Sequence, residues 1–179
     1  MFFNTRKKKE KEKAKELADA ILNTFKTGLF NTKYHKTVGQ FTLPPNIFKD
    51  IYISGFVEHF ISLNLNYFYK EIKTSSSNAD FLFDVYRNLG LNKDEIELYS
   101  HLLTNEKIRK DWDAADGRYT LGKEHARLCF CCMFNIFTIE ENSELLPKAK
   151  EIAKKMPNII GNETFEVKLI TAMCELTIY

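Results

Sequence analysis

The chain has 179 residues, of which 44% are hydrophobic and 28% charged, with only 7 Gly and 4 Pro. This composition excludes collagen-like and low-complexity proteins, and the length suits one domain with a sizeable core. The net charge of +2 is unevenly distributed, because residues 6–16 carry +4 and leave −2 for the rest of the chain. Lysine outnumbers arginine by 21 to 5, whereas nucleic-acid sites favour arginine. Charge and composition therefore argue against a nucleic-acid-binding domain.

The predicted fold is an all-α, single-domain bundle of six or seven helices, because few Gly and Pro residues are available for the tight turns of a β-protein. Residues 1–13 are predicted to form a projecting, charged extension of the first helix, and residues 14–179 the helical domain. Apolar residues at helical spacing from Ala14 to Leu29 define one buried face. We expect Thr5 to cap this helix and Gly28 to end it.

Residues 29–45 lack a clear period and are expected to form a loop. Between Ile47 and Tyr69, 14 of 23 residues are apolar, which predicts a buried central helix capped by Asn46. Gly55 within it would allow a close helix crossing. After a polar linker over residues 74–78, a helix is expected to end at Gly90, and the pattern Asn92–Glu95 predicts a capping box that opens the next helix.

The longest break in the second half is expected from Asp111 to Gly122. A second buried helix is predicted over residues 123–137, and a further helix ends before Pro157. The last segment, residues 163–178, fits a helix through its 3.6-residue spacing and a strand through alternation around Phe165. We favour the helix, and the strand stays open.

One candidate site is an acidic, glycine-containing segment that resembles a calcium-binding EF-hand loop. Its potential ligands are Asp111, Asp113, Asp116 and Glu124. Two departures weaken the match, because one residue is inserted and Glu124 lies seven residues after Gly117 rather than six. An ordinary polar turn is the alternative interpretation.

A second candidate combines His125, Cys129 and Cys132, which share one face of a helix and suit zinc as ligands. Packing of these residues in the core is the alternative, because free cysteines are usually buried. The prediction for cofactors is none, with calcium and zinc as the two metals that these patterns would fit.

The third candidate is a basic surface for a partner protein or an anionic membrane, at the N-terminal end of the chain. It comprises Arg6, Lys7, Lys8, Lys9, Lys11 and Lys13. The glutamates between them favour a solvated helix extension as the alternative. No stretch is long enough to span a bilayer, and the crowding of Cys129, Cys131 and Cys132 indicates a reduced, cytoplasmic protein.

No phosphate-binding loop or common catalytic motif is found in the sequence. The leading hypothesis is a non-enzymatic helical protein that acts through protein–protein contacts, either with a partner or by self-association. The alternative is a metal- or small-ligand-binding protein that uses the acidic loop, the His–Cys face or an aromatic-lined cavity. The 15 Phe and 8 Tyr residues fit both a filled core and such a cavity. An enzyme with its site in the aromatic core is the third hypothesis.

Overall fold

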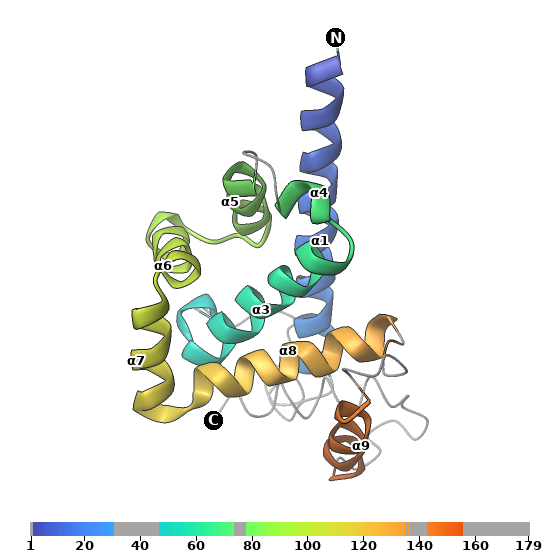
Figure 1. Ribbon diagram of the computed structural model, residues 1–179, viewed down its shortest axis with the longest axis vertical. Coiled ribbons are helices and arrows are strands. Elements are labelled where there is room, and N and C mark those ends of the chain that lie inside the picture. Colours follow the sequence, from blue (N-terminus) through green and yellow to red (C-terminus); the bar gives the residue numbers. More distant parts are fainter. Residues whose placement is uncertain (1, 31–46, 74–77, 135, 137–142, 156–179) are drawn as a thin grey trace.

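The computed structural model in Figure 1 describes residues 2–30, 47–73, 78–134, 136 and 143–155. These residues form eight α-helices and one short 3-10 helix, without a strand. The elements in chain order are α1 (Phe2–Phe30), η1 (Ile47–Lys49), α3 (Ile51–Tyr67), α4 (Lys70–Lys73), α5 (Asn78–Asn88), α6 (Lys93–Thr104), α7 (Glu106–Asp116), α8 (Arg118–Phe134) and α9 (Leu145–Lys155). The all-α prediction is therefore confirmed.

Helices α3 and α8 lie side by side at the centre and run in the same direction (Figure 1). Two glycines allow their backbones to touch. A Cβ atom on Gly55 would lie 2.2 Å from the carbonyl oxygen of Tyr119, and one on Gly122 would lie 2.1 Å from that of Tyr52. The prediction of two central buried helices, with a close crossing at Gly55, is confirmed.

Helix α1 packs against α5 and α3 through a face that includes Leu17, Ile21 and Phe25. Burial of each of these side chains contributes about 1.5–3 kcal/mol. The N-terminal end of α1 projects beyond the other helices (Figure 1), as the fold prediction has it.

The predicted limits of the first helix are wrong, because Thr5 and Gly28 both lie inside α1. Lysine and glutamate favour the helix and carry it back to Phe2. A helical glycine costs about 1 kcal/mol, which the buried face of α1 outweighs.

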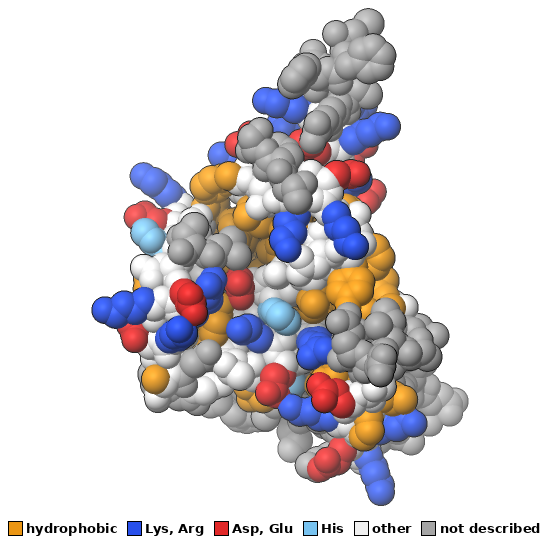
Figure 2. Space-filling model, viewed as in Figure 1, with side chains coloured by type: hydrophobic (Ala, Val, Ile, Leu, Met, Phe, Trp, Pro, Cys, Tyr) orange, Lys and Arg blue, Asp and Glu red, His pale blue; other side chains and the backbone are white. Residues whose placement is uncertain are grey.

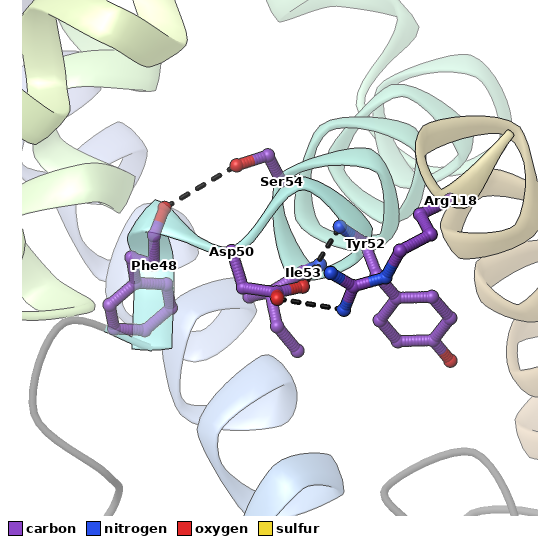
Figure 3. Close-up of polar contacts among 6 residues, drawn as sticks. All are labelled: Phe48, Asp50, Tyr52, Ile53, Ser54 and Arg118. Carbon is purple, nitrogen blue, oxygen red and sulfur yellow. Dashed lines mark hydrogen bonds and ion pairs between the residues drawn. The ribbon is translucent and has the colours of Figure 1, made fainter. Parts of the chain in front are cut away.

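The expected single helix over residues 47–69 is divided at Asp50. This residue has an extended backbone, with φ −69° and ψ 132°, and its carboxylate accepts hydrogen bonds from the backbone N–H groups of Tyr52 and Ile53. Asp50 therefore caps α3 and separates it from η1, whereas Asn46 lies outside the described residues. Figure 3 shows this cap, together with the bond from the Ser54 hydroxyl to the Phe48 carbonyl oxygen.

The turn around α5 and α6 is as predicted. Gly90 has a positive φ of 83° directly after α5, and the reciprocal bonds between Asn92 and Glu95 form the expected capping box.

The predicted break from Asp111 to Gly122 is wrong, because α7 continues to Asp116 and α8 begins at Arg118. Gly117 alone makes the turn, with a φ of 68°. A left-handed glycine ends one helix and turns the chain within one residue, so that α8 runs crosswise to α7 (Figure 1) and the acidic residues before Gly117 remain helical. The second buried helix thus starts five residues earlier than expected and ends at Phe134.

The predicted helix before Pro157 is confirmed as α9, which is described up to Lys155. Residues 31–46, 74–77, 137–142 and 156–179 lie outside the described part, so the loop at 29–45, the linker and the helix-or-strand choice at 163–178 stay predictions.

Candidate functional site at the junction of helices α3 and α8

Two buried hydrogen bonds join α3 to α8. The Tyr52 hydroxyl and His125 Nδ1 are 2.7 Å apart, and the Tyr119 hydroxyl donates to Glu58 Oε2 at 2.8 Å. Arg109 of α7 lies 3.9 Å from the same carboxylate. We call these two pairs the polar seam. Since a buried polar group without a partner costs about 1–3 kcal/mol, the seam fixes how α3 and α8 sit against each other.

His125 is 2% exposed and forms one of the two hydrogen bonds of the seam. Its pKa is lowered to about 4, chiefly by burial and secondly by the Lys148 ammonium, while the Glu124 carboxylate partly opposes the shift. The imidazole is therefore neutral at pH 7 and held by Tyr52.

At the N-terminal ends of the two helices, Arg118 Nη2 lies 2.8 Å from Asp50 Oδ2 (Figure 3). The other carboxylate oxygen, Oδ1, caps α3. One carboxylate thus caps the start of α3 and binds the first residue of α8, which keeps the two N-termini together.

The phenols of Tyr86 and Tyr99 form a second buried polar feature. Their rings are 5.4 Å apart, and the Tyr86 hydroxyl has no hydrogen-bond partner among the described residues. Burial raises the pKa of both phenols. Tyr99 and then Glu58 raise the pKa of Tyr86 further. At Tyr99 a hydrogen bond with Ser54 partly opposes the shift, and the carboxylates of Glu95 and Asp50 add to it. Both groups stay protonated and belong to the packed interior.

The residues of the proposed zinc face lie on α8. Cys129 lies four residues after His125 on this helix and is buried, whereas Cys132 is half-buried. Within the described residues, no three His, Cys, Asp or Glu side chains gather closely enough to hold a metal ion. Cys174, considered as a fourth ligand, lies outside that part.

The residues of the proposed calcium loop are divided between two helices. Asp111, Asp113 and Asp116 belong to α7, where Asp111 is exposed and the other two side chains are not described. Glu124 is exposed on α8 and forms an ion pair with Lys148. Because this segment is helical, it lacks the alternating loop oxygens of an EF-hand.

The basic residues of α1 are only partly available as a positive surface. Lys7, Lys8, Lys9 and Lys11 are exposed, whereas Lys13 pairs with Glu71 at 2.8 Å and lies over the Tyr69 ring. The side chain of Arg6 is not described. A groove of about 290 Å³ lies between α1 and α5. Lys7 and Lys11 share its walls with three acidic residues, Glu10, Asp80 and Asp84.

A pocket of about 230 Å³ lies between the later turns of α3 and α8. Its polar side chains are His59 and Arg127, and its remaining walls are mainly apolar and aromatic. Sequence reasoning missed this pocket. No local pattern marks it, because its two helices bring together residues as far apart in the sequence as His59 and Arg127.

Four aromatic rings form a continuous group where α3 and α8 end: Tyr67, Phe68, Phe130 and Phe134. Phe134 lies 4.7 Å from Phe68 and 4.8 Å from Phe130, and Tyr67 lies 5.3 Å from Phe130, measured between ring centroids. We call this group the aromatic cluster. Phe130 is buried, whereas Phe68 is 48% and Phe134 40% exposed. Figure 2 shows hydrophobic side chains at the surface over this end of the two helices.

Comparison with models of protein families, with curated proteins and with solved structures gave no match to this chain. Among the described helices, none combines the length and the apolar character that crossing a membrane requires.

Proposed function

We propose that this protein acts through protein–protein contacts made by the aromatic cluster, without catalysing a reaction. The observation that carries the proposal is the exposure of Phe68 and Phe134, whose rings face solvent while they stack on each other and on buried Phe130. Exposed aromatic rings over a rigid base provide large contact area at little entropic cost, which is typical of binding hot spots.

The rigid base comes from the helix junction beneath. Phe130 contacts Phe60 of α3 at 5.9 Å in an edge-to-face arrangement, so the cluster continues into the core. A partner that covers Phe68 and Phe134 would therefore bind preordered side chains.

The basic end of α1 offers a second contact surface, for a partner protein or an anionic membrane, in keeping with its exposed lysines. We place the protein in the cytoplasm, since Cys129, Cys131 and Cys132 crowd within four positions, unlike the spaced cysteines of a secreted disulfide scaffold.

Sedimentation velocity of the purified chain tests the role of the aromatic cluster. We expect self-association that Phe134→Ser weakens at least tenfold, and that Phe83→Ser, a matched change at a 41% exposed ring on α5, leaves unchanged. If the wild-type chain is monomeric, a photoreactive phenylalanine analogue at position 134 should cross-link a partner in cells, whereas the same analogue at position 83 should not. Failure of both experiments would refute the proposal.

A further inference from the structure

The pocket between α3 and α8 has a largely apolar wall that includes two ordered aromatic rings. Leu63, Tyr67 and Phe130 line it, and the centroids of the Tyr67 and Phe130 rings lie 5.3 Å apart. Phe130 is also held from the core by Phe60, at 5.9 Å between centroids. Because this wall is preordered, it can cover a flat ring at little cost in side-chain entropy.

His59 provides an uncharged polar group in the same pocket. Its ring is half-buried, and its pKa is lowered to about 4, chiefly by burial and then by the charges of Lys123 and Arg127. The imidazole is therefore neutral at pH 7, with one nitrogen that donates a hydrogen bond and one that accepts. Among the described residues, none forms a hydrogen bond with this ring. A ligand that bonds to His59 would thus replace the water that the ring loses on burial.

The groups around His59 favour a neutral ligand. No carboxylate is found among the described residues that line the pocket, so a cation would lack a counter-ion. An anion would lose its hydration without a replacement, because Arg127 already has an interaction within the protein and Lys123 does not line the pocket.

The polar group and the size of the ligand follow from His59 and the volume. A hydroxyl group both donates and accepts, so it can pair with either nitrogen of the imidazole in either tautomer. An apolar cavity of about 150 Å³ is large enough for benzene, and this pocket has a volume of about 230 Å³. It therefore accommodates one aromatic ring together with a hydroxyl group.

We propose that this pocket binds a small, uncharged phenol, whose hydroxyl bonds to His59 and whose ring packs on Tyr67 and Phe130. Recognition needs no free charge, because the hydrogen bond and the ring contacts are made by neutral groups. The site is also independent of the proposed protein contacts, since Phe68 and Phe134 do not line the pocket.

Phenol and toluene are matched probes, because they have nearly the same size and differ by a hydroxyl in place of a methyl group. Titration of the labelled full chain, followed by amide NMR, should give a Kd on the order of 1 mM for phenol, with shifts centred on the α3 and α8 residues that line the pocket. Benzoate should bind roughly tenfold more weakly or worse, because the site does not replace its hydration. Phenol shifts located elsewhere, or benzoate binding as tight as that of phenol, would overturn the proposal.

His59→Leu should weaken phenol by roughly three- to tenfold, as expected for the loss of one hydrogen bond, without weakening toluene. His101→Leu is the matched control, since the His101 side chain is 60% exposed on α6 and does not line the pocket; it should change neither affinity. Equal weakening of both probes by His59→Leu would refute the hydrogen bond.

If His59→Leu does not fold, Leu63→Trp provides a second variant, which should abolish phenol binding by filling the pocket. Unchanged phenol affinity in a folded His59 or Leu63 variant would refute the assignment. Phe134→Ser should retain phenol binding, so failure of this proposal and failure of the protein-contact function are distinguishable.

Discussion

Substitution of Gly122 by alanine tests whether the backbone contact of α3 with α8 holds the fold together. The new Cβ would lie 2.1 Å from the Tyr52 carbonyl oxygen and 2.9 Å from the Phe56 nitrogen, whereas ordinary contact begins near 3.4 Å. Both neighbours are backbone atoms, so no side chain can rotate away. The two helices must therefore separate by about 1 Å.

The magnitude follows from three contributions. Overpacking costs about 1–3 kcal/mol, and opening of the 2.7 Å bond between Tyr52 and His125 leaves buried polar groups unpaired at about 1–3 kcal/mol. Alanine gains about 1 kcal/mol over glycine in a helix. We expect a net loss of about 1–5 kcal/mol, which lowers the Tm of a chain of this size by about 2–20 °C.

Circular dichroism at 222 nm during thermal unfolding measures the loss, and imidazole NMR follows His125. In Gly122→Ala the pKa of His125 should rise from about 4 towards 6.5 as the seam opens. Gly90→Ala is the control, since its new Cβ meets open space and the cost of about 1–2 kcal/mol comes only from the positive φ; His125 should not change. A Gly122→Ala protein as stable as wild type, with His125 unaffected, would refute the reasoning.

Three further predictions concern the same helix pair. Tyr52→Phe should lower the free energy of unfolding in urea by about 1–3 kcal/mol, because His125 loses its partner; a change below 0.5 kcal/mol would contradict the role of the seam. Asp50→Ala should cost about 1–2 kcal/mol, whereas Asp50→Asn should cost less than about 1 kcal/mol, because asparagine retains the cap and loses only the partly exposed ion pair with Arg118; equal losses would argue against the cap. Stability should also fall as the pH is lowered from 6.5 to about 4. In this window the unfolded chain binds protons at His59 and His125 that the folded chain excludes, at a cost of up to about 3 kcal/mol for each histidine. His59→Gln should reduce this slope in urea titrations at pH 7, 5.5 and 4.5, and an unchanged slope would exclude His59.

Local sequence patterns were sufficient for much of the fold. The apolar content of residues 47–69 predicted a central helix, and Gly90 and the Asn92–Glu95 pair predicted a helix end and a helix start that the structure contains. These features depend on residues within a few positions of each other, so they can be recognised in a single sequence.

The predicted helix boundaries were wrong where a single residue decides between two local conformations. The acidic stretch before Gly117 fits a polar turn as well as a helix end, and the left-handed glycine is sufficient to turn the chain from α7 into α8. Similarly, the sequence predicts Asn46 as the cap of the central helix, whereas Asp50 caps α3. Composition alone does not separate such alternatives.

The seam and the pocket depend on tertiary structure. Tyr52 and His125 are 73 residues apart, and Tyr119 and Glu58 are 61 apart. Periodicity shows which face of each helix is apolar, but not which turn of α3 meets which turn of α8. That register follows from the close approach of Gly55 and Gly122 to the opposite backbone. The register brings His59 of α3 together with Arg127 and Phe130 of α8 in the lining of the same pocket. The sequence by itself thus determined the helices, and their packing decided the site, because contact between distant residues requires a three-dimensional register that local spacing does not encode.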